Sequence, residues 1–182
     1  MITDYFNHPD REEIVWRDYT IAIDPGSHES GVALYHQCDL KLLVMMDLFD
    51  LASLFTLVPE VTYVMEDVKA NGFIYGRNQH ASKAAAAKIS QNVGEVKNTQ
   101  TQIQLAMSKA GVTPVLIKPT KGNWGTISAK LGRQMLQEVT GWNGSSNKDT
   151  RSAAYLGCLY AMSKKRQVPI MRPASDFDWR AP

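Results

Sequence analysis

Three acidic residues stand where strands or helices are expected to end or begin. Asp24 follows an apolar stretch, Glu66 lies near the end of a second one, and Asp149 opens an Ala-rich segment. Carboxylates that converge without basic partners suit Mg²⁺, which prefers oxygen ligands and leaves positions open for water and phosphate. Two such ions about 4 Å apart would activate a water and stabilise the leaving oxygen in phosphodiester hydrolysis. The spacing therefore indicates a metal-dependent nuclease site.

Each acid also has a simpler explanation when its stretch is taken alone. Asp24 precedes Pro25-Gly26, so it could cap the turn of its own hairpin. Asp149 could be an acid favoured at a helix N-terminus for electrostatic reasons alone. Both explanations stay open until the elements that position the acids are considered.

The stretch YTIAIDPGSHESGVALY predicts two strands, 20–23 and 31–35, joined by a tight turn. Ile21 and Ile23 fall on one face of the first strand and Ala22 falls on the other, so this strand is apolar on both faces. Such a strand is expected at the centre of a covered sheet.

The rest of the chain alternates between strand and helix patterns. Strands are expected at 40–47, 61–68 and 112–118, and helices at 50–57, 80–111, 127–139 and 149–165. Asp50 is the expected N-cap of the first helix and Gly111 the C-cap of the second. In the third helix Leu131, Met135, Leu136 and Val139 are expected to point inward.

This order predicts an α/β fold with a five-stranded mixed sheet and helices on both faces. Three consecutive strands can meander antiparallel, whereas the two later strands return parallel through helical crossovers. Ala153, Gly157 and Ala161 form a stripe of small residues that lets the last helix lie close to the sheet, which presses Asp149 toward the strand ends. We assign 1–18 as an N-terminal extension, 19–165 as one domain and 166–182 as an irregular tail.

The charge is distributed unevenly along the 182 residues. Residues 1–67 hold 13 of the 18 acidic and 3 of the 20 basic residues, although the whole chain carries a net charge of only +2. The basic second part favours a nucleic-acid surface, although solvated helix faces would also account for it. Two distant cysteines, and no apolar run of membrane-spanning length or signal-peptide pattern, lead us to expect a cytoplasmic protein without structural zinc or a membrane partner.

The stretches IAIDPGSHESGVALY and TYVMEDV, together with the Asp149-led last helix, resemble the RuvC-type Holliday-junction resolvases. The resemblance runs from about residue 19 to 162. It implies a ribonuclease H-like nuclease domain in which Asp24, Glu66 and Asp149 are catalytic metal ligands for Mg²⁺, with Mn²⁺ as a substitute. It further implies a homodimer that binds four-way DNA junctions and cuts them with paired nicks.

The chain departs from this family at one position. The family's last helix usually carries two aspartates three residues apart, but Ser152 stands at the second place. We include Ser152 in the candidate metal set, although a neutral hydroxyl is a weak ligand and a bystander role is favoured. Asp67 follows Glu66 directly, so it points to the opposite face of the strand and is not recruited.

Basic and aromatic residues complete the expected site. In the family, lysines near Lys118 and Lys121 help to hold phosphate, and Lys148 beside Asp149 would do the same; plain solvated lysines are the alternative. The loop NGFIYGR resembles the family's mobile aromatic loop, whose side chains stack on unpaired bases; burial in the core is the rival explanation. The expected nucleic-acid-binding residues are Phe73, Tyr75, Arg77, Lys83, Lys118, Lys121 and Lys148.

Other function classes remain possible from the sequence. A ribonuclease H-like nuclease for flaps, branched DNA or RNA–DNA hybrids needs the same carboxylates. A non-catalytic nucleic-acid-binding module would be consistent with the missing acid at Ser152. A phosphotransferase of the actin and hexokinase type is disfavoured, because such folds need two duplicated domains.

Overall fold

The computed structural model describes residues 2, 16–70, 83–120 and 122–163. These residues build one five-stranded sheet with the strand order β3-β2-β1-β4-β5. The strands are β1 (Tyr19–Asp24), β2 (Ser30–His36), β3 (Asp39–Met46), β4 (Thr62–Glu66) and β5 (Val115–Ile117). The helices are α2 (Leu48–Leu57), α3 (Lys83–Lys109), α4 (Ala129–Thr140) and α5 (Lys148–Ser163), with short 3-10 turns η2 (Trp16–Asp18) and η3 (Val68–Ala70).

The pairing of the strands confirms the predicted mixed sheet. β1 pairs antiparallel with β2, and β2 pairs antiparallel with β3, so the first three strands form a meander. β1 pairs in parallel with β4, and β4 with β5, as expected for strands that return through helical crossovers. β1 therefore lies at the centre of the sheet, and Asp24 is its last residue.

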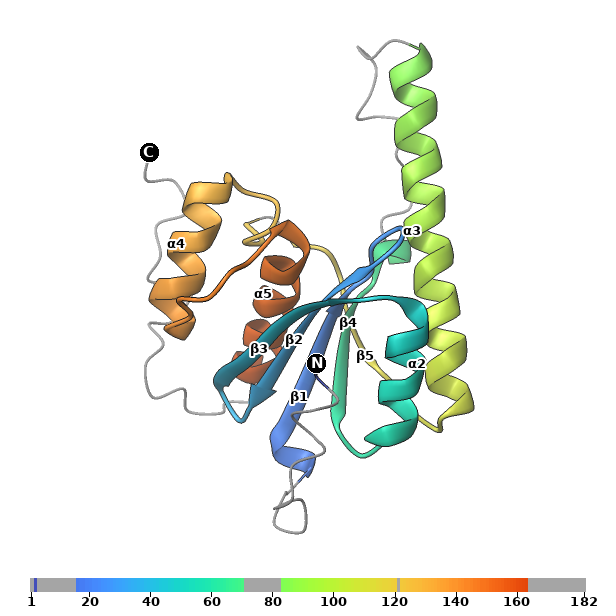
Figure 1. Ribbon diagram of the computed structural model, residues 1–182. Coiled ribbons are helices and arrows are strands. Elements are labelled where there is room, and N and C mark those ends of the chain that lie inside the picture. The colour runs from blue at the N-terminus through green and yellow to red at the C-terminus, as the bar shows by residue number, and fades with distance from the viewer. Residues whose placement is uncertain (1, 3–15, 71–82, 121, 164–182) are drawn as a thin grey trace.

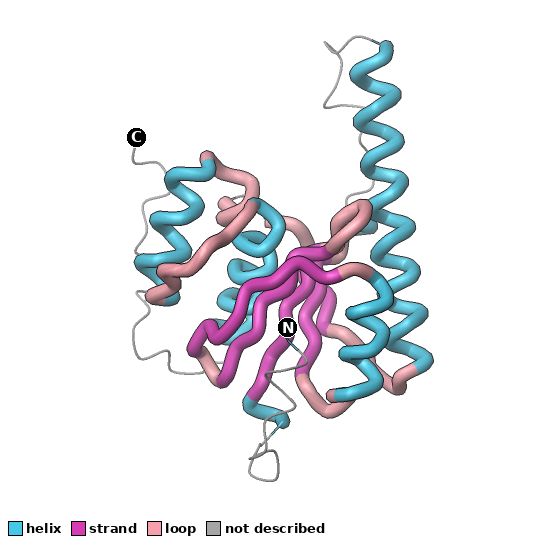
Figure 2. Tube along the Cα trace, viewed as in Figure 1, coloured by secondary structure: helices cyan, strands magenta, loops and turns pink. Residues whose placement is uncertain are grey.

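Helices cover both faces of the sheet, as Figures 1 and 2 show. α2 and α3 pack on the face that carries Ile21 and Ile23, and this core also contains Phe55 and Tyr63. α5 lies on the other face against Ala22, with α4 packed beside it. The alternation of Ile and Ala along β1 thus feeds two separate cores, as the pattern predicts.

α2 corrects one predicted helix start. Its N-cap is Asp47, whose side chain accepts a hydrogen bond from the backbone N–H of Asp50 at 2.9 Å. Asp50 was the predicted cap, but it lies in the first turn. The chain has an acid at both positions, and the helix uses the earlier one because β3 already ends at Met46.

α3 ends as predicted, at a glycine in the left-handed conformation. Gly111 has a φ of 73°, and its N–H donates to the carbonyl of Ser108 while the N–H of Val112 donates to that of Met107. This pair of bonds is the Schellman arrangement that satisfies the last carbonyls of a helix. The first half of α3 extends well beyond the sheet in Figure 1, and its side chains from 87 to 92 are exposed.

α4 and β5 show two further differences from the sequence. Met135, Leu136 and Val139 are buried as predicted, but Leu131 is 39% exposed. Leu131 lies in the first turn, where Gly132 is the residue that packs against the Trp124 carbonyl and the Arg151 side chain. β5 spans only three residues, so Val112 and Lys118, which were predicted to lie in this strand, lie outside it.

The N-terminal and C-terminal segments fall almost wholly outside the described residues. Ile2 is an exception, since it is buried in the core beneath α2 and α3. In the described part of the chain, no helix is both long enough and apolar enough to cross a membrane.

Candidate active site

The carboxyl ends of the central strands bring Asp24 and Glu66 together. β1 and β4 run in parallel with Ile23 opposite Met65, so the next residue of each strand lies at the same edge of the sheet. The two side chains share a hydrogen bond, and both are partly covered by protein. This is the convergence that the sequence predicts for the first two acids.

The shared bond has a clear electrostatic cause. Burial, followed by the charge of Glu66, raises the pKa of the Asp24 carboxyl well above its usual value. Burial also raises the pKa of Glu66, while the hydrogen bond from Asp24 acts in the opposite direction. Two buried carboxylates without a cation between them repel each other, and a proton held between them relieves that repulsion.

Asp149 enters the site from α5. Its charge also raises the pKa of Asp24, so the third predicted acid lies within electrostatic reach of the first. Asn147 and Thr150 fix this helix start: the side chain of each accepts a hydrogen bond from the backbone N–H of the other, at 2.8 and 3.0 Å. This reciprocal capping holds the first turn, and Asp149 with it, at the edge of the sheet.

Small residues allow the close approach of α5. A Cβ atom at Gly31 of β2 would collide with the backbone of Asp149, and one at Gly157 would meet the ring of Tyr35. Ala153 and Ala161 are buried on the same helix. The small residues Ala153, Gly157 and Ala161 therefore let α5 lie close to the sheet, as predicted. Gly31 lets the start of this helix contact β2.

Ser152 lies beside Asp24 and is 6% exposed. Its side chain hydrogen-bonds to Asp24 and lowers the pKa of that carboxyl, against the effect of burial. The loop before α4 covers it, because a Cβ at Gly125 would collide with Ser152 Oγ and with the carbonyl oxygen of Lys148. Ser152 therefore contacts Asp24, a candidate metal ligand, through a hydrogen bond.

The donor set fits a divalent cation that keeps several waters. Among the described residues, no three His, Cys, Asp or Glu side chains are grouped tightly enough to enclose a metal ion. Asp24 and Glu66 nevertheless form a tight pair with Asp149 nearby, and Mg²⁺ is commonly held by one or two carboxylates plus waters and substrate phosphates. A cation between the pair would also remove the repulsion that raises the pKa of Asp24.

The lysines of the site are exposed. Lys118 directly follows Ile117, which pairs with Glu66, so it stands at the same sheet edge. Lys148 Nζ lies 3.9 Å from Asp149 Oδ1, and its side chain is 75% exposed. Lys83 begins α3. The remaining predicted nucleic-acid-binding residues, Phe73, Tyr75, Arg77 and Lys121, lie outside the described residues, as does the Lys83 side chain.

Asp67 turns away from this group. Its Oδ1 accepts a hydrogen bond from Gln100 Nε2 at 3.1 Å, and Gln100 is a buried residue of α3. Asp67 thus fastens α3 to the end of β4, on the face opposite Ser152, as the strand period predicts.

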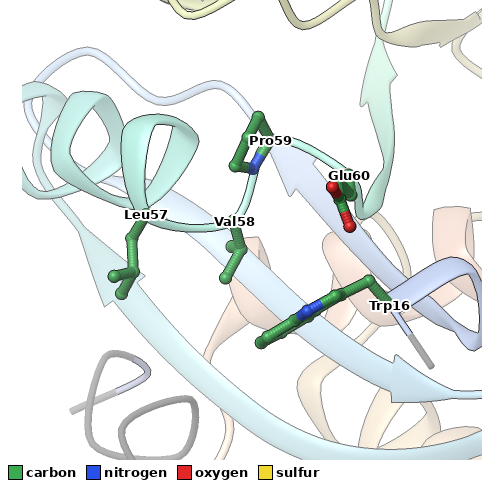
Figure 3. Close-up of a pocket in the computed structure, with 5 residues that line it drawn as sticks. All are labelled: Trp16, Leu57, Val58, Pro59 and Glu60. Atoms are coloured by element: carbon green, nitrogen blue, oxygen red, sulfur yellow. The ribbon is translucent and has the colours of Figure 1, made fainter. Parts of the chain in front are cut away.

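A second hollow lies at the other end of the sheet. Trp16, Pro59 and Glu60, with Leu57 and Val58, line a pocket of about 140 Å³ (Figure 3). It adjoins the start of β1 and of β4, whereas the carboxylates stand at the ends of those strands. This pocket is therefore separate from the candidate site.

Sequence reasoning missed several residues that shape the site. Gly125 and the buried Arg151 act through contacts between segments distant in sequence, for which a single sequence carries no signal. The Asn147–Thr150 cap could have been read from its spacing of three residues before an Ala-rich run. Trp142 stands between glycines in GWNG, the same kind of signal that drew attention to NGFIYGR.

Comparison with known proteins gives structural matches and no sequence matches. A scan against protein-family models found no match, and no curated protein sequence matches the chain. A Thermus thermophilus RuvC in complex with Holliday junction substrate superposes with a TM-score of 0.55 and 11% identity, covering 81% of this chain and 94% of that one. A second structure of Thermus thermophilus RuvC gives a TM-score of 0.52 and 12% identity, over 85% and 99%. The chain therefore has the ribonuclease H-like fold of RuvC, as predicted.

Proposed function

We propose that this protein is a magnesium-dependent endonuclease that resolves four-way DNA junctions by paired phosphodiester hydrolysis. The observation that carries the proposal is that Asp24, Glu66 and Asp149 lie near one another at one sheet edge. The negative charges of Asp24 and Glu66 repel each other there. The RuvC-like fold supports a nuclease, and the substrate of one such RuvC structure, a Holliday junction, suggests the class of DNA.

The residues divide the work by position. Asp24 and Glu66 would hold the cation between strands β1 and β4, and Asp149 would complete its charge from α5. When bound, Mg²⁺ activates a water and stabilises the leaving oxygen. Lys118 and Lys148 are exposed beside these acids and would hold the phosphates of the strand over the site. Mn²⁺ is expected to replace Mg²⁺.

A homodimer would place two such sites for paired nicks. The projecting half of α3 supports this part of the proposal, because its exposed side chains from 87 to 92 include Ile89, which is 37% exposed. Covering Ile89 would remove apolar surface from water, and a second copy is the partner that paired nicks require. Sedimentation equilibrium should give twice the chain mass, and a monomer at micromolar concentration would remove this part of the proposal.

The direct test offers the purified protein several substrates with Mg²⁺ or Mn²⁺. We expect a four-way junction to be cut in preference to a flap, a linear duplex or an RNA–DNA hybrid. Preferential cleavage of flap or hybrid would assign the protein to the broader ribonuclease H-like nucleases. Junction binding without cleavage in either metal would assign it to the non-catalytic binding modules.

Two variants and a matched control test the site. Asp24→Asn and Asp149→Asn should each lower junction cleavage by at least about a hundredfold, because each removes a ligand charge, while junction binding without metal is retained. Asp67→Asn is the control, since it removes the neighbouring charge on the opposite face and should leave cleavage within about threefold. Near-full activity of either site variant would refute the assignment.

A further inference from the structure

A small cavity lies between α4 and the loop that leads to α5. It measures about 130 Å³ and is lined by Arg133 and Gln137 of α4 and by Trp142, Asn143, Gly144 and Ser146 of the loop. A water occupies about 30 Å³ in the liquid, so the space suits a group of roughly phosphate size together with some water. We call this cavity the α4–α5 pocket.

The charge around the α4–α5 pocket is positive. Arg133 is exposed and makes no ion pair within the described part of the chain. It lines the pocket, and none of the lining residues is acidic. Arg151 Nη1 lies 3.4 Å from the carbonyl of Ser146, another lining residue, so two guanidinium groups border the pocket and give it an excess of positive potential.

Polar groups around the pocket add to this preference. Ser146 Oγ has no hydrogen-bond partner among the described residues, but the atom is closed off from solvent and does not border the open space of the pocket. Gln137 donates from Nε2 to Asn143 Oδ1 at 2.7 Å, which ties the loop to α4. The Trp142 indole N–H donates to the carbonyl of Ser145 at 3.2 Å, and its ring packs on Gly144. The loop side of the pocket is therefore held in place by hydrogen bonds in the absence of a ligand.

Arg151 couples this pocket to the candidate active site. It is 4% exposed, and its Nε donates to the carbonyl of Trp124 at 3.2 Å while Nη1 lies 3.4 Å from the carbonyl of Ser146. Gly132 gives it room, since a Cβ there would meet Arg151 Nε at 2.9 Å. Arg151 thus fixes a wall of the pocket to the same helical turn that carries Asp149, so a group held in the pocket has a defined position relative to the acids.

We propose that the α4–α5 pocket binds a backbone phosphate of the nucleic acid outside the cleaved bond, with Arg133 as its cation. Arginine suits this role because its planar guanidinium can contact two phosphate oxygens at once. The proposal rests on the proposed function, because it assigns one additional contact to the same bound DNA. It adds a contact from α4 to the expected set, which comprises Lys118, Lys148 and the loop at 73–77.

The test measures binding to a labelled four-way junction by fluorescence anisotropy in EDTA, across a series of salt concentrations. Arg133→Gln should weaken binding by roughly tenfold and reduce the slope of log K against log salt by about 1, as expected for one lost phosphate contact. Lys109→Gln is the matched control, because Lys109 is an exposed cation at the end of α3 on the other face of the sheet. It should change the affinity by less than about twofold.

A second variant keeps the test independent of any single substitution. Arg133→Glu reverses the charge instead of removing it, so it should weaken junction binding by more than Arg133→Gln does. Arg133 is exposed, and the melting temperatures of both variants should stay within about 2 °C of the wild type. Thermal unfolding with and without millimolar inorganic phosphate, at matched ionic strength, separates the sources: a free-phosphate site should give a melting-temperature shift that Arg133→Gln abolishes, and a nucleic-acid site should give none.

The outcomes are distinguishable from a failure of the proposed function. If the wild type binds and cuts junctions but Arg133→Gln behaves like Lys109→Gln, the pocket proposal alone is overturned. If inorganic phosphate raises the melting temperature of the wild type and not of Arg133→Gln, while both proteins bind the junction equally well, the pocket is a free-phosphate site and the proposal is again overturned. If the wild type binds no DNA at all, both proposals are overturned together.

Discussion

The two faces of the sheet are packed by different means. The face under α2 and α3 is filled by large side chains, among them Ile23, Phe55 and Tyr63. The face under α5 also buries large side chains, such as Tyr35 and Leu156, but Ala22 and Ala33 of the strands pack with alanines and a glycine of the helix. These small residues leave room for the helix backbone to approach the strands. The second arrangement is the one that delivers Asp149.

The comparison predicts that the two faces respond to opposite kinds of substitution. Removing volume should be most harmful under α2 and α3, and adding volume should be most harmful under α5. The predictions below begin with the largest expected effect.

Phe55→Ala should cost about 3–5 kcal/mol of folding free energy, because Phe55 is fully buried and its ring meets that of Tyr63 edge-on at a centroid distance of 5.1 Å. Urea unfolding followed by circular dichroism measures this loss. Phe49→Ala on the same helix is the control, since Phe49 is 82% exposed and should change stability by less than about 0.5 kcal/mol. Equal losses for the two would contradict the description of this face.

Gly157→Val should cost about 3 kcal/mol through overpacking, because even a Cβ there would lie 2.5 Å from the Tyr35 ring. The displaced helix should also reduce junction cleavage in the variant that remains folded. Gly94→Val in α3 is the matched control, since a Cβ at Gly94 meets nothing within 4 Å. If Gly157→Val proved as stable as that control, α5 would not lie as close to the sheet as described.

Asp24→Asn tests how much folding free energy is lost by placing the ionised Asp24 carboxylate beside Glu66 at the sheet edge. A carboxyl whose pKa is raised by folding holds its proton where the unfolded chain has lost it, so stability falls as pH rises from about 4 through the folded pKa. In EDTA at neutral pH the variant should therefore be more stable than the wild type by about 1–3 kcal/mol.

The same measurement has an internal check. The advantage of Asp24→Asn should vanish near pH 4 and should be reversed by saturating Mg²⁺, which stabilises only the wild type. Thermal unfolding at several pH values gives both readings. A variant less stable than the wild type in EDTA at neutral pH would show that the charge of Asp24 is compensated within the protein.

Tyr35→Phe and Tyr63→Phe give the smallest effect and the most direct comparison. Tyr35 donates a buried hydrogen bond to the carbonyl of Ala154 in α5 at 2.7 Å, whereas Tyr63 donates to that of Val58 after α2 at 3.1 Å. Each loss should cost about 1 kcal/mol. Only Tyr35→Phe should also lower cleavage, because only that bond holds the helix of Asp149. Equal cleavage by the two variants would show that the hydrogen bond from Tyr35 to α5 does not affect activity.

The sequence was sufficient for the order and layering of the elements. The alternation of Ile21, Ala22 and Ile23 is a local pattern, and it correctly predicted a central strand with two different cores. The helix start at Asp47 was missed because Asp50 offers the same cap chemistry three residues later. Leu131 was placed inward because periodicity does not show that Gly132, one residue later, makes the contact with Trp124 and Arg151.

The candidate site was predictable only in part, for a physical reason. An acid at a strand end is visible in a sequence, so Asp24 and Glu66 could be named, and Asp149 followed from its helix. The contact between Ser152 and Asp24, the cover provided by Gly125 and the burial of Arg151 are tertiary contacts between segments that carry no mutual pattern. The metal roles of the acids stay predictions until metal binding is measured.

The close approach of Gly125 to Ser152 limits how this protein could change over evolutionary time. Aspartate at position 152 would be larger than serine in a space already closed by the loop, so it would require the loop to move as well. A fourth carboxylate is therefore out of reach of a single substitution without a loss of stability. The small volume of serine and the close approach of the loop are therefore linked: a change at position 152 is expected to need a compensating change near Gly125.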